Sequence, residues 1–221
     1  MKFLQNIREF TPSLKALALY HRYKNFTMIP KVVFIDNLLL CLKAKNIHGA
    51  VVECGVWKGG MSAAIAELLG NKKKYYLFDS FEGLPDAKEI DGENAIEWQK
   101  NKGGSAYFDN CKAKIEFAQK AMKLSGAEDY DIVKGWFKDT LKDFSKDERI
   151  AILRIDGDWY ESTTECLEYL YDKVEKNGII ILDDYYAWNG CAQAIHAFLS
   201  RNNIPDKIRQ TQNGVAYIIK S

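Results

Sequence analysis

Two pairs of aspartates each follow an apolar run, and carboxylates gathered in this way could bind a cation. Asp156 and Asp158 end the segment ILRIDGD, and Asp183 and Asp184 end the segment IIILDD. In extended backbone, residues two apart project to the same side, so Asp156 and Asp158 can face one pocket. Four carboxylates at neighbouring strand ends would repel one another without a cation, and hard oxygen ligands with no nearby His or Cys suit Mg²⁺ or Ca²⁺. The alternative is that some of these aspartates cap the N-termini of helices.

A glycine-rich turn lies earlier in the chain, in the segment VVECGVWKGG. Gly55, Gly59 and Gly60 follow an apolar run that contains the acidic Glu53. This pattern predicts a strand that ends in a tight turn and opens a helix, leaving backbone that a ligand can approach closely. Asp79 ends the next apolar run, 19 residues after Gly60, where a carboxylate can accept both hydroxyls of a ribose. Such glycines can also serve packing alone, but together with Asp79 they predict a nucleoside ligand.

Glu53 helps to choose between nucleoside ligands. A dinucleotide turn needs the pattern G-x-G-x-x-G so that a pyrophosphate can lie at the helix N-terminus, but Glu53 stands two positions before Gly55. Its carboxylate would repel pyrophosphate and would suit the ammonium and sulfonium groups of S-adenosylmethionine. Two alternatives stay open: a nicotinamide-dependent oxidoreductase, which would share Asp79, and a non-catalytic binding protein that acts as the subunit of another enzyme.

The elements that must position these residues alternate between strands and helices. Short apolar runs predict strands at Ala50–Cys54, Tyr75–Asp79, Asp131–Lys134, Ile150–Ile155 and Gly178–Leu182. Helical patterns separate them, such as Glu161–Gly178, whose Asn177-Gly178 end is typical of a helix C-cap. The alternation predicts an α/β fold in which helices cover both faces of a parallel sheet and ligands bind at the carboxyl ends of the strands. Asn213-Gly214, between two apolar runs, predicts an antiparallel hairpin near the C-terminus.

No linker divides the sequence, so we expect a single ligand-binding domain with an appended segment. A helical N-terminal segment over residues 1–48 leads into the alternating pattern of residues 49–221. The stretch Pro85–Gly104 is rich in charge and bears glycine turns, so we predict an insertion, or lid, over the ligand-binding edge of the sheet.

Composition excludes several classes of partner. The 221 residues include 31 basic and 30 acidic side chains, so the chain offers no electrostatic attraction to nucleic acid. The five cysteines are odd in number and lack a CxxC spacing, which disfavours a disulfide framework and a zinc site and favours a reducing compartment. The longest apolar run, Val32–Leu42, spans 11 residues and contains Asp36, so it is too short and too polar to cross a bilayer. We therefore expect a cytoplasmic enzyme or binding protein with no membrane partner.

Five segments, taken in order, carry a resemblance to a known family: VVECGVWKGG, YLFDSFEGLP, GWFKDTL, LRIDGDWYEST and IIILDDYY. From about Tyr23 to the C-terminus, the sequence resembles the macrocin O-methyltransferase (TylF-type) family. Its members are class I methyltransferases that use S-adenosylmethionine and a divalent metal to methylate sugar hydroxyls. The resemblance implies a Rossmann-like fold over residues 49–221, with a mostly parallel seven-stranded sheet, a C-terminal antiparallel hairpin and helices on both faces.

The resemblance also implies roles for individual residues. The cofactor S-adenosylmethionine would contact Thr27, Met28, Glu53, Cys54, Gly55, Val56, Trp57, Asp79, Ser80, Phe81, Gly135, Trp136 and Phe137. Asp156, Asp183 and Asp184 match the metal-binding aspartates of the family and would hold Mg²⁺ or another divalent cation. The acceptor would be a sugar-containing small molecule.

A sugar hydroxyl must lose its proton to accept a methyl group, and a bound metal ion would help because it makes the hydroxyl a stronger acid. Our hypothesis is that Asp156 contributes to catalysis through the metal, that two vicinal hydroxyls of the acceptor complete the metal's shell, and that Asp158 takes the proton. His196 is the rival base, on a helix predicted just after the segment IIILDDYY. The sequence leaves open which sugar is the acceptor, which hydroxyl is methylated and whether the protein forms a homo-oligomer.

Overall fold

The computed structural model describes the backbone of residues 2–221 and the side chains of residues 12–221. Within this range the α-helices are α1 (Lys2–Tyr23), α2 (Lys31–Lys43), α3 (Gly60–Leu69), α4 (Glu93–Lys100), α5 (Ile115–Ser125), α6 (Phe137–Thr140), α7 (Tyr160–Leu170) and α8 (Asn189–Arg201). The strands are β1 (Ala50–Cys54), β2 (Tyr75–Asp79), β3 (Tyr130–Lys134), β4 (Ile150–Ile155), β5 (Val174–Leu182), β6 (Arg209–Gln210) and β7 (Ala216–Ile219). Four 3₁₀ helices complete these elements: η1 (Lys24–Phe26), η2 (Glu89–Asp91), η3 (Leu141–Asp143) and η4 (Tyr171–Lys173).

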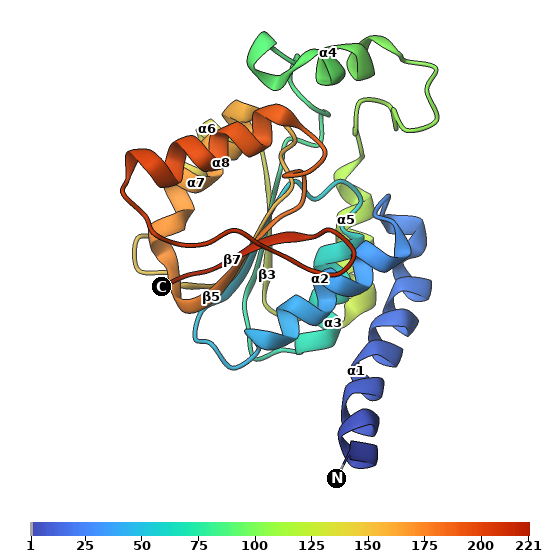
Figure 1. The fold of residues 1–221 in the computed structure, drawn as a ribbon. Helices are drawn as coiled ribbons and strands as arrows, with labels where there is room; N and C mark the ends of the chain where they lie inside the picture. The colour runs from blue at the N-terminus through green and yellow to red at the C-terminus, as the bar shows by residue number, and fades with distance from the viewer. Residues whose placement is uncertain (1) are drawn as a thin grey trace.

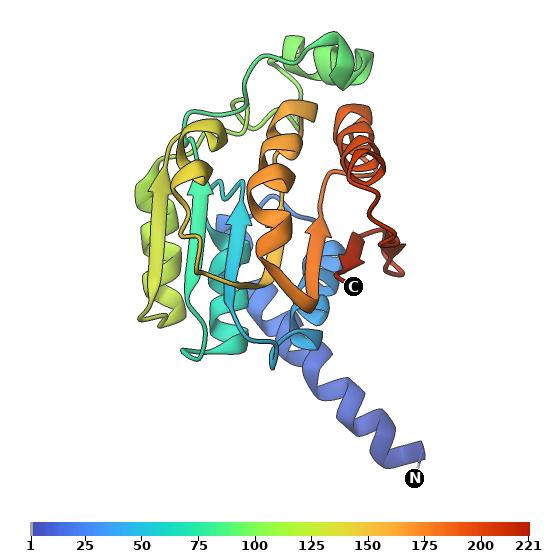
Figure 2. The ribbon, with the colours of Figure 1, turned by 90° about the vertical axis from the view of Figure 1, so that its left-hand side faces the viewer.

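The strands form one seven-stranded sheet in the order β3-β2-β1-β4-β5-β7-β6. The strands β1 to β5 pair in parallel, whereas β7 runs antiparallel to both β5 and β6. This arrangement confirms the predicted parallel sheet with a C-terminal antiparallel hairpin. It also brings the carboxyl ends of β1, β2, β4 and β5 to one edge, where the arrowheads in Figure 2 point.

Helices cover both faces of the sheet, as Figure 1 shows with the sheet seen nearly edge-on. The helices α1, α2, α3 and α5 pack together on one face, and α6, α7 and α8 lie on the other. Each face of the sheet has its own hydrophobic core: the first core lies under α1, α2, α3 and α5, and the second lies under α7 and α8. Successive residues of a strand point to opposite faces, so Val51 belongs to the first core and Val52 to the second. The central strands β1 and β4 are buried throughout, so an ionised side chain within them stands out.

The predicted end of the helix before β5 is wrong. The helix α7 ends at Leu170, and β5 already begins at Val174, which pairs with Ile150 of β4. Asn177 has a φ of 64°, and its N–H donates to the carbonyl of Lys220 at 2.9 Å. The Asn177-Gly178 pair, typical of a C-cap, therefore forms an irregularity within a strand.

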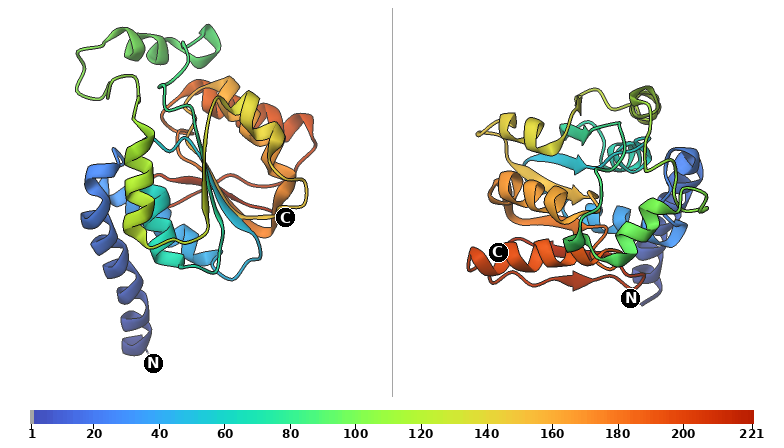
Figure 3. Two further views of the ribbon diagram at one scale, coloured as in Figure 1. Left: turned by 180° about the vertical axis from the view of Figure 1, so that it is seen from behind. Right: turned by 90° about the horizontal axis from the view of Figure 1, so that it is seen from above.

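The start of α1 and the insertion lie at opposite ends of the sheet. The start of α1 projects beyond the amino-terminal edge of the strands, while its second half contributes Ala16 and Leu19 to the first core. The insertion, with η2 and α4, lies beyond the carboxyl edge, as the view from behind also shows (Figure 3). No helix among the residues described above is both long enough and apolar enough to cross a membrane.

Candidate active site

A cavity of about 390 Å³ opens at the carboxyl edge of the sheet, where residues at or just beyond the ends of β1, β2, β4 and β5 line it. Its walls include most of the residues that the family resemblance assigns to the cofactor, namely Thr27, Met28, Glu53, Gly55, Val56, Trp57, Asp79, Ser80, Gly135, Trp136 and Phe137. The same cavity is lined by the four aspartates Asp156, Asp158, Asp183 and Asp184. The fold thus brings the predicted cofactor residues and the acidic residues together.

The turn after β1 requires glycine at position 55 for a geometric reason. Gly55 has a φ of 91°, and a Cβ atom built there would overlap the carbonyl oxygen of Asp156. The backbone of Gly55 therefore lies directly against the end of β4, and any side chain would push the two strand ends apart. This glycine sets the spacing between the cofactor turn and the acidic loop.

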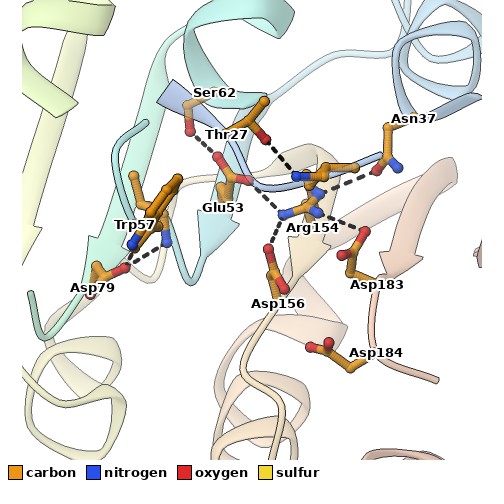
Figure 4. A network of polar contacts seen from close by, with 12 residues as sticks. Thr27, Asn37, Glu53, Trp57, Ser62, Asp79, Arg154, Asp156, Asp183 and Asp184 are labelled. Carbon is orange, nitrogen blue, oxygen red and sulfur yellow. Dashed lines mark hydrogen bonds and ion pairs between the residues drawn. The ribbon is translucent and has the colours of Figure 1, made fainter. Parts of the chain in front are cut away.

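Asp79 ties the end of β2 to this turn. One oxygen of its carboxylate accepts the backbone N–H groups of Val56 at 2.7 Å and Trp57 at 2.8 Å, and the other accepts that of Phe81 at 2.6 Å. Burial raises the pKa of Asp79, and these three N–H groups act against that rise. In addition to the ribose contact predicted from the sequence, Asp79 holds the turn that faces the cavity (Figure 4).

The side chain of Arg154 lies at the centre of a buried charge network, shown in Figure 4. Its Nη1 atom donates to Glu53 Oε1 at 2.7 Å and to Asp156 Oδ2 at 2.6 Å. Its Nη2 atom lies 2.6 Å from Asp183 Oδ1, in an ion pair whose angles are not those of a hydrogen bond. Its Nε atom donates to Asn37 Oδ1 at 3.2 Å. One guanidinium group therefore faces three carboxylates.

Glu53 has a different environment from the one its sequence position indicates. Its carboxylate is fully paired inside the protein, because the hydroxyl of Ser62 donates to the oxygen that Arg154 does not contact. Burial raises the pKa of Glu53, and the adjacent guanidinium opposes the rise. The expected partner of Glu53 was a cationic ligand, whereas its nearest cation is Arg154.

Three carboxylates form a cluster next to this network. One oxygen from each of Asp156, Asp158 and Asp184 lies within 4.8 Å of the others. The N–H of Asp158 donates to Asp184 Oδ2 at 2.9 Å, and the indole N–H of Trp188 donates to Asp158 Oδ1 at 2.9 Å. Burial raises the pKa values of Asp158 and Asp184, and the negative charge of the neighbouring carboxylates adds to the rise. A hard cation would relieve this repulsion.

The cluster differs in one member from the metal set that the resemblance implies. Asp158 takes the place of Asp183, because the Asp183 carboxylate points to Arg154. Arg154 is paired with Glu53, Asp156 and Asp183, whereas neither Asp158 nor Asp184 forms an ion pair with any described side chain. The donor set of Asp156, Asp158 and Asp184 consists of carboxylate oxygens alone, and this chemistry fits Mg²⁺.

Three of the predicted site residues do not line the cavity. Cys54 is buried in the core on the α7 side of the sheet, and Phe81 is buried in the core on the α3 side. The side chains of Cys54 and Phe81 therefore face the cores and not the cavity, and their contact with the cofactor stays a prediction. His196 is exposed on α8, and its Nε2 atom lies 2.9 Å from the Tyr185 hydroxyl. This position outside the cavity disfavours His196 as the base.

Sequence reasoning did not single out two residues of the site. Arg154 has a local signal, because it is a lone ionised residue within the apolar strand AILRI, where an unpaired charge would be costly. Trp188 has none, because tryptophan after an acidic loop is equally typical of simple packing. Its contact with Asp158 joins positions 30 residues apart.

The comparisons with known proteins decide the family. Residues 7–220 match the family described as Macrocin-O-methyltransferase (TylF). The chain belongs to this family. As a TylF-family protein it is an O-methyltransferase whose methyl donor is S-adenosylmethionine, and this resolves the choice between a methyltransferase and the two alternatives left open by the sequence.

Relatives of known name support the assignment. The TylF-family chain is 33% identical over 189 residues, covering 80% of itself and 69% of the relative, to the 8-demethyl-8-(2,3-dimethoxy-alpha-L-rhamnosyl)-tetracenomycin-C 4'-O-methyltransferase of Streptomyces olivaceus. It is 29% identical over 183 residues to the Mycinamicin III 3''-O-methyltransferase of Micromonospora griseorubida, covering 79% of itself and 70% of the relative. The solved structure of the O-methyltransferase NovP matches with a TM-score of 0.73 and 27% identity, over 89% of this chain and 82% of that one.

Proposed function

We propose that this O-methyltransferase transfers a methyl group to a hydroxyl of a sugar or of a glycosylated small molecule, with the help of a divalent cation. The names of two relatives support a sugar acceptor. One name contains a rhamnosyl-bearing tetracenomycin, and the other is a mycinamicin III 3''-O-methyltransferase, whose doubly primed number is of the kind used for sugar atoms. The acidic cluster beside the cavity supports the cation. The observation that carries the proposal is this juxtaposition of carboxylates and cofactor cavity in a member of the TylF family.

The cofactor would lie along the turn after β1. Its fit is supported by Trp57, a residue of the cavity wall whose buried Nε1 atom has no hydrogen-bond partner among the described residues. Bound S-adenosylmethionine supplies a methyl group that is already activated by the sulfonium, and its sulfur leaves as the neutral thioether of S-adenosylhomocysteine. Asp79 would accept the ribose hydroxyls, and Trp136, which is 37% exposed, would cover the adenine.

We assign Asp156 and Asp184 to the cation and Asp158 to the proton. When bound, the cation would make a nearby hydroxyl a stronger acid. One oxygen of Asp158 lies within 4.8 Å of an oxygen of each of the other two carboxylates, and burial raises the pKa of Asp158. Asp158 is therefore suited to take the hydroxyl proton while the acceptor oxygen forms its bond to the methyl carbon. The proton thus ends on the Asp158 carboxylate, and the methyl group ends on the acceptor oxygen.

The experiment is methyl transfer from isotopically labelled S-adenosylmethionine to a panel of deoxysugars, nucleotide-sugars and glycosylated small molecules. We expect a mass gain of one methyl group on at least one sugar hydroxyl, activity that EDTA abolishes, and recovery with Mg²⁺. Methylation of an aglycone hydroxyl alone would contradict the sugar assignment. Full activity in EDTA would contradict the metal.

Four aspartate variants separate the roles. Asp184→Asn should lose metal affinity and most turnover, while Asp158→Asn should keep metal affinity and lose about 10²–10⁴-fold in turnover. Asp172→Asn is the matched control, because the side chain of Asp172 is 97% exposed and lies outside the cavity lining. If Asp158→Asn weakens metal binding as much as Asp184→Asn or Asp156→Asn does, Asp158 is a third ligand and our assignment of the base is wrong.

A further inference from the structure

Trp188 stands between the acidic loop and α8, where its backbone and its ring contact different aspartates. Its backbone N–H donates to the carbonyl of Asp184 at 3.0 Å. Its indole N–H donates to Asp158 Oδ1 at 2.9 Å. One residue therefore bridges the two aspartates of the cluster that have no ion pair with Arg154.

Asp158 has an unusual backbone conformation and a single side-chain donor among the described residues. Its φ of 58° lies in the left-handed region that side chains other than glycine rarely adopt. Its own N–H is held by Asp184 Oδ2 at 2.9 Å, so the backbone is fixed at this point. The rotation of its carboxylate is left to side-chain contacts, and among the described residues Trp188 supplies the side-chain hydrogen bond that it accepts.

The ring of Trp188 is itself held in place by two other tryptophans. Its centroid lies 5.2 Å from that of Trp159 and 5.8 Å from that of Trp98, both in edge-on arrangements. The Trp159 ring is fully buried, and its indole N–H donates to the carbonyl of Pro85 at 2.9 Å. Trp98 belongs to α4 of the insertion, and its N–H donates to the carbonyl of Ala106 at 3.1 Å. Neighbours on both sides thus restrict the direction in which Trp188 donates.

We infer that Trp188 is a positioning residue for methyl transfer: its indole N–H fixes one oxygen of Asp158, so that the other is directed to the acceptor hydroxyl. The inference rests on the proposed role of Asp158 as the proton acceptor. Indole is suited to this task because it only donates, and a donor cannot compete with the carboxylate for the acceptor's proton. The hydrogen bond holds the carboxylate in one rotamer before the acceptor arrives, and catalysis gains from such fixed geometry.

The test is Trp188→Phe, which keeps an aromatic ring against Trp98 and Trp159 and removes the N–H. We expect kcat to fall by roughly 10–100-fold, as for the loss of one hydrogen bond to a charged group. The KM for S-adenosylmethionine and the affinity for S-adenosylhomocysteine, measured by calorimetry, should stay within about two-fold. The matched control is Tyr171→Phe, which also keeps an aromatic ring and loses a donor to a carboxylate, that of Asp206, but lies outside the cavity lining. Its kcat should stay within about three-fold of the wild-type value.

A double variant shows whether Trp188 acts through Asp158. In an enzyme that already carries Asp158→Asn, the further change Trp188→Phe should lower kcat by less than about three-fold, because there is no base left to position. If Trp188→Phe lowers kcat by the same factor in the wild-type and the Asp158→Asn backgrounds, the inference is overturned and Trp188 serves packing alone. The two factors can be compared even if Trp188→Phe lowers the melting temperature.

The single variants separate the inference from the proposal beneath it. If Asp158→Asn loses turnover while Trp188→Phe keeps the wild-type kcat, the positioning role is wrong and the base assignment stands. If Asp158→Asn keeps near wild-type turnover, the base assignment is wrong, and the positioning role falls with it.

Discussion

Replacing Arg154 with methionine should destabilise the protein more than any other single change to a charged residue of the site. The guanidinium is fully buried and lies 2.6–2.7 Å from carboxylate oxygens of Glu53, Asp156 and Asp183. Methionine matches the aliphatic part of arginine in bulk but leaves the three carboxylates with no counter-charge. The variant therefore isolates the contribution of the charge.

The size of the effect follows from burial. At an effective dielectric constant of about 20, two charges at this separation attract by roughly 6 kcal/mol, and much of that is offset by the desolvation of both ions. Removing one partner of a buried pair typically costs about 3–5 kcal/mol, because the other charge is left uncompensated. We expect a loss of this size for Arg154→Met, which corresponds to a fall of about 6–20 °C in Tm for a chain of this length.

The effect should also depend on pH. Burial raises the pKa of Glu53 and Arg154 opposes the rise, so the folded Arg154→Met variant should bind a proton at Glu53 at a higher pH than the unfolded chain does. When the pKa of a carboxyl group is higher in the folded state than in the unfolded chain, the free energy of unfolding falls as the pH rises. This fall begins at the unfolded pKa, about 4.3, and ends at the folded pKa. The deficit of the variant should thus be largest at neutral to alkaline pH and smaller near pH 5.

The assay is urea denaturation followed by circular dichroism, with Arg149→Met as the matched control. Arg149 pairs with Glu175 at 2.9 Å, but the two side chains are 40% and 30% exposed, so its loss should cost less than about 1 kcal/mol. A deficit for Arg154→Met no greater than that of Arg149→Met would refute the reasoning. If Arg154→Met does not fold, adding Glu53→Gln should restore part of the stability, because one uncompensated carboxylate is removed.

Three further predictions concern the cavity. Asp79→Ala should weaken S-adenosylmethionine binding by about ten-fold or more in calorimetry and should also lower Tm, because three backbone N–H groups lose their acceptor; unchanged affinity would contradict the ribose contact. Gly55→Ala should abolish cofactor binding in the same measurement, because its Cβ would overlap the Asp156 carbonyl, and wild-type affinity would show that the turn can move. Limited trypsin digestion should cut the insertion at the exposed Lys102 in the free enzyme and more slowly with cofactor and acceptor present, as for a lid; equal rates would count against a lid.

Much of the fold follows from local sequence signals. Each predicted strand is present, three of the five with the predicted bounds, because continuous apolar runs between turn signals leave few other arrangements for a buried parallel sheet. The hairpin at Asn213-Gly214 forms for an equally local reason. The predicted end of α7 was wrong because Asn177-Gly178 suits any position that needs a positive φ, not only a helix C-cap. Val174 pairs with β4, so the Asn177-Gly178 pair lies within a strand.

The charge network of the site could not be predicted in the same way. Arg154 meets Asn37 across 117 residues of sequence and Glu53 across 101, and neither contact has a local signature. The choice between Asp183 and Asp158 in the acidic cluster also depends on tertiary structure. Asp183 contacts Arg154, whereas its neighbour Asp184 joins the acidic cluster, and which of them does so depends on where Arg154 lies.

This placement of Arg154 explains how the site can contain so many carboxylates without losing its geometry. Arg154 and Asp156 are two residues apart along β4 and its end, so both project to the same side, and Arg154 is in register with Glu53 on β1. The same guanidinium also contacts Asp183 at the end of β5, so it links the three strand ends that surround the cavity. A shift of β1 or β5 by one residue would separate the carboxylate of Glu53 or Asp183 from the guanidinium with which it is paired, which is far more costly than the loss of an apolar contact. The network therefore opposes such shifts, and it leaves Asp158 and Asp184 without an ion pair among the described side chains, at the place where the proposed cation and proton acceptor would act.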